Sequence, residues 1–189
     1  MMRNSVISAA IGLKAFNGKN HYEKAFQCWL GENKARFVVI DQAKRAAFAK
    51  VKIKSFDFIV SADDGKLCLT EVKGRKFKGT TLENKSAMQC WVTMDDVNGL
   101  SSWQEIFGQD YKAVFVFAYD IETPDIDADD VEIFEFEGRH YCFYLISLAD
   151  YKKFMVLRSP KWQTVTLLAE DFKSCARQAK YLLMLERCK

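Results

Sequence analysis

The sequence predicts a layered α/β domain in which a mixed sheet is flanked by helices. Two amphipathic segments alternate with short runs of β-branched and aromatic residues, in the order helix, three strands, helix, strand. This order is typical of a sheet covered by helices. No repeat and no linker rich in Pro, Gly or Ser divides the sequence, so we expect one domain over residues 1–189.

The first half of the chain supplies a helix and three strands. Apolar side chains recur at helical spacing over residues 21–32, at Tyr22, Phe26, Trp29 and Leu30, and predict an amphipathic helix. Segments rich in β-branched and aromatic residues predict strands over 36–40, 56–60 and 67–72. The polar residues 61–66 contain Asp-Asp-Gly, which indicates that the last two strands form a hairpin.

The second half supplies the remaining elements. The cationic residues 74–86 are expected to form a mobile loop, followed by a helix over 95–107 with Thr93 or Asp95 as its cap. The unbroken apolar run 112–119 is typical of a strand buried on both faces. The prediction is completed by a hairpin of 133–136 and 140–146 around Glu137-Gly138, and by helices over 150–158 and 170–185.

Composition excludes several classes of protein. Of 189 residues, 49% are hydrophobic, only 2 are Pro and 9 are Gly, which excludes collagen-like, mucin-like and largely disordered chains. No apolar run reaches the roughly 20 residues of a bilayer-spanning helix, and segment 6–13 is expected to be a tail or part of a first helix rather than a signal peptide. The 6 Cys include no Cys-x-x-Cys pair, so we expect reduced thiols, a cytoplasmic location and no membrane partner.

Charge is divided unevenly along the chain. Residues 1–94 contain 17 Lys and Arg against 8 Asp and Glu, whereas residues 95–189 contain 11 against 17. The basic half includes a cluster at Lys34, Arg36, Lys44, Arg45, Lys50, Lys52 and Lys54. A basic face indicates an anionic partner such as nucleic acid, although a solvated surface gives the same pattern. The acidic segment 120–137 is expected to be an exposed loop and strand face.

Three charged residues of the predicted hairpin form a candidate catalytic site. Glu71 and Lys73 are two residues apart on one strand, so their side chains leave the same face. With the turn centred on residues 63–64, Asp57 of the partner strand falls next to Glu71. Two carboxylates beside a lysine suit metal-assisted phosphodiester hydrolysis, because carboxylates hold Mg²⁺ and the lysine stabilises charge on the phosphate. An ordinary charged strand end is the alternative.

These residues resemble the PD-(D/E)XK nuclease superfamily, which includes restriction endonucleases, Holliday junction resolvases and recombination exonucleases. The resemblance covers residues 20–119 and rests on Phe56-Asp57-Phe58 and Thr70-Glu71-Val72-Lys73-Gly74. It implies a restriction-endonuclease-like core of αβββαβ order there, with residues 120–189 as a C-terminal α+β extension. It also implies Mg²⁺ or Mn²⁺ as cofactor. The segment that contains the first helix also resembles a group of bacterial proteins that carry a His-Tyr-Glu motif, which is His21-Tyr22-Glu23 in this sequence.

The resemblance implies a role for each residue of the site. Asp57 and Glu71 would hold the metal, with the backbone carbonyl of Val72 as a third ligand. Lys73 would be the catalytic lysine, orienting the attacking water or stabilising the charged phosphate. Glu23 matches a glutamate that some members carry on the first helix, where it supplies a further oxygen to the metal or its water.

Further candidates concern nucleic-acid binding. Arg75, Lys76 and Lys78 are expected to follow a phosphate backbone, with a solvated loop as the alternative. Trp91 is a candidate to stack on a base, with burial in the core as the alternative. The turn Arg158-Ser159-Pro160-Lys161-Trp162 carries two cations and is a candidate for an additional nucleic-acid contact.

We therefore expect a divalent-metal-dependent nuclease with DNA as its substrate and a homodimer as a possible assembly. Two other functions remain open. One is a nuclease-like module that binds nucleic acid without cutting it, for which binding would be sensitive to salt and insensitive to chelators. The other is a protein-interaction domain whose acidic segment 120–137 docks a basic partner, for which no nucleic-acid binding is expected even at low ionic strength.

Overall fold

The computed structural model of the chain describes residues 20–40, 53–62, 65–82, 85, 87–123, 126, 128 and 130–183. Three features predicted from the sequence lie outside the described residues. They are the apolar segment 6–13, the turn residues 63–64, and four members of the basic cluster: Lys44, Arg45, Lys50 and Lys52. Within these ranges, none of the helices combines the length and apolar character that crossing a membrane requires. The cysteines in these ranges are free thiols.

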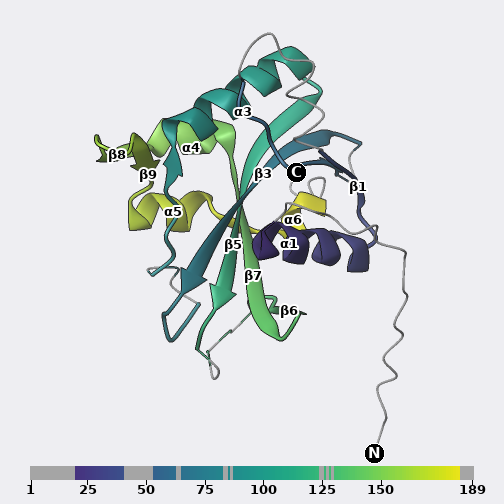
Figure 1. Cartoon of the computed structure of the whole chain (residues 1–189), viewed down its shortest axis with the longest axis vertical. Helices are drawn as coiled ribbons and strands as arrows, with labels where there is room; N and C mark the ends of the chain where they lie inside the picture. The colour runs from purple at the N-terminus through teal and green to yellow at the C-terminus, as the bar shows by residue number, and fades with distance from the viewer. Residues whose placement is uncertain are drawn as a thin grey trace, which may run out of the picture.

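A mixed sheet forms the centre of the molecule (Figure 1). Its strands are ordered β1-β2-β3-β5-β7-β10, and β6 pairs with the beginning of β7. β3 and β5 run parallel along their whole length, whereas the other neighbours in this order are antiparallel. The strands are β1 (Arg36–Val39), β2 (Phe58–Ser61), β3 (Leu67–Phe77), β5 (Tyr111–Ile121), β6 (Phe134–Phe136), β7 (Arg139–Ser147) and β10 (Arg177–Gln178).

One face of the sheet is covered by α1 (His21–Glu32) and α6 (Lys180–Leu183). The side chain of Asn20 caps α1 by accepting hydrogen bonds from two backbone N–H groups of its first turn. The apolar stripe predicted for this helix is buried, and Phe26 and Trp29 pack with Phe58 and Val72 of the sheet. The interface beneath α1 is therefore mainly apolar, with the polar Gln27 also buried in it.

The opposite face is covered by α3 (Met94–Phe107), α4 (Leu148–Phe154) and α5 (Ala169–Cys175). Phe115 and Phe117 of β5 point to this side and pack with Tyr151 and Phe172 of the covering helices. Because its alternate residues belong to the other core, β5 is buried on both faces, as its unbroken apolar run predicted. In Figure 1 these three helices lie on the side of the sheet away from α1 and α6.

β3 extends further than the sequence predicted. The polar composition assigns residues 74–77 to a loop, but they continue the strand. The parallel register pairs Gly74 with Ala118 and Phe77 with Ile121, so β5 satisfies the backbone groups of this segment. Phe77 is buried in the core on the face of the sheet that α3 covers and packs against Tyr119 of β5, which holds the end of the strand in place. Tertiary pairing thus outweighs the polar character of the local sequence.

The C-terminal elements also differ from the prediction. The helix predicted over 150–158 ends at Phe154 and continues as β8 (Val156–Ser159), which forms a small second sheet with β9 (Thr164–Thr166) and β4 (Val92–Thr93). The helix predicted over 170–185 is replaced by α5, β10 and α6 within its described part. β10 pairs with β7, and the Ala179 N–H donates to the Phe143 carbonyl at 2.8 Å. The open edge of β7 therefore supplies backbone partners that override the helical periodicity.

Candidate functional site: two buried carboxylates and a lysine

Three charged side chains of the β2–β3 hairpin lie together on the face covered by α3. The register of the pair places Asp57, just before β2, opposite Glu71. Leu69 belongs to the core under α3, and since side chains alternate along a strand, Glu71 and Lys73 leave the sheet on the same side. The structure therefore brings Asp57, Glu71 and Lys73 together, as their spacing predicted.

Asp57 is held at the point where the β2–β3 ladder ends. Its side chain is buried, and Oδ2 accepts a hydrogen bond from the Val72 backbone N–H at 2.8 Å. At this position the Asp57 carboxylate accepts the hydrogen bond that a backbone carbonyl of a neighbouring strand would otherwise accept from β3. The N–H and C=O of one strand residue point to the same side, so the Val72 carbonyl also faces the side of Asp57. The role of the Val72 carbonyl as a third ligand stays a prediction.

Lys73 links Glu71 to a carboxylate that sequence reasoning missed. Lys73 Nζ donates to Glu71 Oε1 at 2.6 Å and to Asp96 Oδ1 at 2.9 Å. Asp96 is 5% exposed and also forms an ion pair with Lys54. The ammonium of Lys73 is therefore fixed between one carboxylate of the sheet and one of the helix above it.

The first turn of α3 positions Asp96. Thr93 caps the helix by accepting from the Asp96 N–H at 3.1 Å, and the Asp96 carboxylate accepts from the Thr93 N–H at 2.8 Å. This reciprocal capping box is readable in the sequence as Thr93-x-x-Asp96. The signal locates the start of the helix, but it does not indicate that the same carboxylate reaches Lys73.

The electrostatics of the cluster set the protonation of each group. Burial, reinforced by the charge of Asp57, raises the pKa of Glu71 to about 8 although Lys73 donates to it. Burial opposes the ammonium of Lys73, but the charges of Glu71 and Asp96 raise its pKa above the usual value. Burial likewise opposes charge on Asp96, but Lys73 and Lys54 lower its pKa to about 2. Lys73 is consequently protonated at neutral pH. Glu71 also holds a proton there, and a cation bound at its carboxyl group would displace that proton.

The donor atoms fit a hard divalent cation. Among the described residues no group of three or more His, Cys, Asp or Glu side chains is arranged to hold a metal. Glu71 Oε2, however, is buried without a hydrogen-bond partner, which is costly for a carboxylate oxygen. With Asp57 and the Val72 carbonyl it provides oxygen donors of the type that Mg²⁺ prefers. Because Mg²⁺ keeps several waters and needs only one or two carboxylates, the small donor set is sufficient.

The structure does not place Glu23 beside this cluster. Its carboxylate accepts a hydrogen bond from Asn20 Nδ2 at 2.9 Å, at the start of a helix on the other face of the sheet. Its motif neighbours attach that helix: His21 Nδ1 lies 2.7 Å from the Tyr141 hydroxyl, and the Tyr22 ring covers Gly74. The His-Tyr-Glu motif therefore has a packing role at its first two positions, and the role of Glu23 in catalysis stays a prediction.

The three cations predicted to follow a phosphate backbone separate in space. Arg75 is on the same face as Lys73, where its guanidinium lies 3.9 Å from the ring centre of Trp91 and donates to the Trp91 carbonyl. Lys76 and Lys78 are exposed and both form ion pairs with Glu122, at 2.5 Å and 3.7 Å. Arg75 is thus a partly buried cation near the site, and the two lysines lie at the surface near the end of β3.

The acidic segment is only partly the exposed face that its composition predicts. Asp120 is 5% exposed and pairs with Arg139 at 2.7 Å across the β5–β7 ladder. Its burial follows from its position in β5, which is covered on both sides. Glu135 and Glu137 are exposed, as expected.

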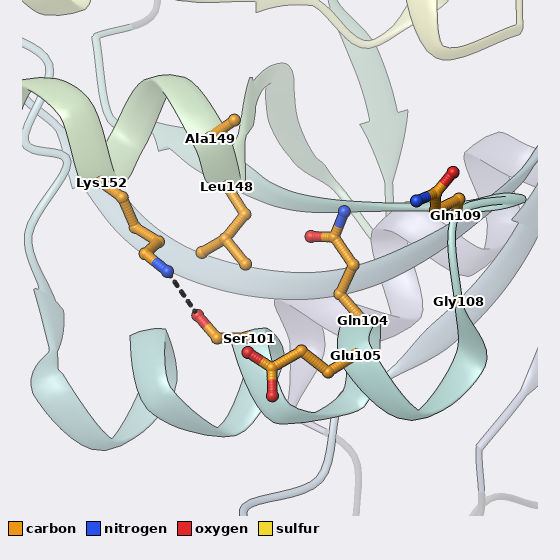
Figure 2. A pocket seen from close by; sticks show the side chains of 8 residues that line it. All are labelled: Ser101, Gln104, Glu105, Gly108, Gln109, Leu148, Ala149 and Lys152. Atoms are coloured by element: carbon orange, nitrogen blue, oxygen red, sulfur yellow. Dashed lines mark hydrogen bonds between the residues drawn. The ribbon is translucent and has the colours of Figure 1, made fainter.

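A pocket of about 480 Å³ opens between the C-terminal half of α3 and the start of α4 (Figure 2). It is lined mainly by polar side chains, and Lys152 Nζ lies 3.4 Å from Ser101 Oγ across it. None of its lining residues belongs to the carboxylate cluster, and no charged group in it is buried. The candidate site is therefore the cluster at the β2–β3 edge and the start of α3, rather than this pocket.

The fold has similar solved structures, whereas the sequence matches no known family. No protein-family model matches the sequence, and no curated protein matches it. The fold is similar to that of Hjc, a Holliday junction resolvase from the archaeal hyperthermophile Archaeoglobus fulgidus. The superposition has a TM-score of 0.46 at 11% sequence identity and covers 82% of this chain and 91% of the resolvase chain.

Proposed function

We propose that the chain is a divalent-metal-dependent nuclease that hydrolyses phosphodiester bonds, with DNA as its substrate. The observation that carries this proposal is the buried pair of Asp57 and Glu71, with Lys73 hydrogen-bonded beside them and Glu71 Oε2 lacking a partner. If both were ionised, the two buried carboxylates would repel each other, and a cation between them would remove that cost. The ion pair with Lys73 satisfies only Oε1 of Glu71, and a bound cation would satisfy Oε2 as well.

Asp57, Glu71 and the Val72 carbonyl would hold Mg²⁺ or Mn²⁺. A bound cation of this kind polarises the phosphoryl oxygen and makes a bound water more acidic. The Val72 N–H fixes the orientation of Asp57 through Oδ2. Glu71 is fixed at Oε1 by Lys73 and presents Oε2. Both carboxylates are thus oriented before any substrate binds.

Lys73 supplies positive charge rather than a base. Its pKa is raised by Glu71 and Asp96, so it stays protonated at neutral pH. Two of the three N–H bonds of its ammonium are directed to these carboxylates, and the third is left for a phosphate oxygen or the attacking water. Charge that develops on the phosphate as the P–O bond breaks is then stabilised by a donor already in position. Asp96 acts through Lys73 and is a positioning residue.

The test compares cleavage of supercoiled plasmid and single-stranded DNA by the wild type and two lysine variants. Lys73→Ala removes the proposed catalytic group, and Lys112→Ala removes an exposed lysine of β5 as a matched control. We expect cleavage to require Mg²⁺ or Mn²⁺, to fall about 100-fold or more in Lys73→Ala, and to be unchanged in Lys112→Ala. Equal cleavage by all three proteins would point to a contaminating nuclease and overturn the role of Lys73. Binding of DNA without cleavage in either metal would favour the binding module instead.

A further inference from the structure

The β8–β9 hairpin exposes an unusual combination of side chains. Trp162, in the turn between the strands, is 68% exposed, and Leu157 on β8 is 62% exposed. Arg158 and Lys161 flank them, and both are exposed. The hairpin packs into the core through Val165, whereas Trp162 and the two flanking cations lie outside that core cluster.

The hairpin is attached directly to the element that carries Asp96. β9 pairs with β4 so that Thr164 lies opposite Thr93, the N-cap of α3. The Met94 N–H, at the first residue of α3, donates to the Gln163 carbonyl at 2.8 Å. The turn that carries Trp162 is therefore joined by backbone hydrogen bonds to the helix end that holds Lys73 through Asp96.

A second connection runs through Trp91. The Arg158 guanidinium lies 5.1 Å from the centre of the Trp91 ring, and that of Arg75 lies 3.9 Å from it. Arg158 is the extra residue of a β-bulge between Leu157 and Ser159, a feature that redirects a side chain. Arg75 is two residues beyond Lys73 on the same face of β3. Cations thus extend from the site to the hairpin.

These cations are not neutralised within the described part of the chain. No carboxylate of the described residues lies within ion-pair distance of Arg75, Arg158 or Lys161. By contrast, Lys73 and Lys76 are each paired with at least one carboxylate. The surface from Trp91 to the hairpin therefore combines unpaired positive charge with an exposed aromatic ring, and complements a ligand that is anionic and has flat apolar faces.

We propose that the β8–β9 hairpin binds unpaired nucleotides of the substrate, with Trp162 stacking on a base and Arg158 and Lys161 contacting the backbone phosphates. In a duplex the faces of the bases are covered by their neighbours, so an exposed indole finds a partner only where bases are unpaired. The cations add affinity that depends on salt and not on sequence. This inference rests on the proposed function for its placement, because it assigns the substrate preference of that same site.

Binding is measured by fluorescence anisotropy in EDTA, so that no cleavage is required. The probes are a labelled 30-nucleotide single strand, the matching duplex, and that duplex with a three-nucleotide bulge. Trp162→Ala removes the proposed stacking ring and Trp162→Phe retains an aromatic ring. Tyr181→Ala, at an exposed aromatic of α6 on the opposite face, is the matched control.

We expect Trp162→Ala to weaken binding of the single strand and the bulged duplex by roughly 5- to 150-fold, as for the loss of one base–aromatic stack. Binding of the plain duplex should change by less than about 2-fold, and Trp162→Phe and Tyr181→Ala should bind nearly as the wild type does. The tryptophan emission that is lost in Trp162→Phe should be the part that the single strand quenches in the wild type. Arg158→Ala should reduce the slope of affinity against salt, whereas the exposed Lys173→Ala should not.

The proposal is overturned if Trp162→Ala binds the single strand and the bulged duplex as tightly as the wild type, or loses affinity equally for all three probes. Equal binding would mean that the hairpin faces solvent, a protein or a second copy of the chain. Failure of the nuclease proposal would look different: Lys73→Ala and the wild type would show the same absence of cleavage, while Trp162-dependent binding persisted. The reverse result, cleavage that requires Lys73 but ignores Trp162, would refute the hairpin proposal alone.

Discussion

Glu71 should make the free protein less stable as the pH rises, and replacement by Gln should remove that dependence. Burial and the neighbouring Asp57 raise the pKa of Glu71 in the folded chain to about 8, whereas an unfolded chain leaves it at the ordinary value of 4.5. The folded state therefore binds the proton more tightly than the unfolded state does. A group of this kind stabilises fully below pH 4.5, and its contribution is lost as the pH rises through 8.

The magnitude follows from the size of the shift. Each unit of pKa difference corresponds to about 1.4 kcal/mol. The free energy of unfolding should therefore fall by about 3 kcal/mol as the pH rises from 5 to 8. For a chain of this length, about 3 kcal/mol corresponds to roughly 6–12 °C in the melting temperature. Asp57 and Lys73 remain in Glu71→Gln, so the comparison isolates the titration of one carboxyl group.

The assay is thermal or urea unfolding of the wild type and Glu71→Gln from pH 5 to pH 8.5, in EDTA and in Mg²⁺. Glu135→Gln, at an exposed position of β6, controls for the loss of one charge. In EDTA the wild type should lose about 3 kcal/mol relative to Glu71→Gln across this range. In Mg²⁺ the wild type should recover stability, increasingly at higher pH because the cation displaces a proton, and Glu71→Gln should not.

Parallel pH curves for the wild type and Glu71→Gln would refute the reasoning, because they would show that Glu71 titrates alike in both states. A stabilisation by Mg²⁺ that survives in Glu71→Gln would refute the assignment of Glu71 as a ligand. Glu135→Gln should follow the wild type in both solutions, and a difference there would reveal a general effect of charge.

Three further variants test the surroundings of the site. Asp96→Asn should lower the free energy of unfolding by about 2 kcal/mol at pH 7, because the pKa of Asp96 is lowered to about 2 in the folded state. The difference between the variant and the wild type should vanish as the pH falls from 4 to 2. Urea unfolding at a series of pH values measures the difference and its pH dependence. The same variant should also slow cleavage through misplacement of Lys73, with kcat falling more than KM rises, and equal effects on both would contradict a positioning role. Gly74→Ala should destabilise by about 1–3 kcal/mol, since its Cβ would lie 2.0 Å from the Tyr22 ring, and an unchanged melting temperature would show that α1 shifts freely. Tyr151→Phe should lower the free energy of unfolding by about 1–3 kcal/mol, because the buried carbonyls of Cys90 and Val165 lose the hydroxyl that donates to both. An unchanged free energy of unfolding would mean that water replaces the hydroxyl.

The local parts of the site were predictable from the sequence. Glu71 and Lys73 share a face because strand side chains alternate with a period of two, and a short hairpin turn is enough to bring Asp57 opposite Glu71. The burial of β5 on both faces follows from its unbroken apolar run in the same way. These features depend on residues near one another in the chain, so periodicity and turn chemistry determine them.

Features that depend on distant contacts were decided only by the tertiary structure. Asp96 reaches Lys73 because α3 crosses over β3, and a capping motif cannot show which strand a helix covers. The polar residues after Gly74 become strand because β5 is there to pair with them, and the last predicted helix gives way to β10 because β7 offers an open edge. The turn that carries Trp162 is joined to the start of α3 only because β9 pairs with β4. In each case the free energy comes from a partner far away in the sequence, and local propensity is too weak to oppose it.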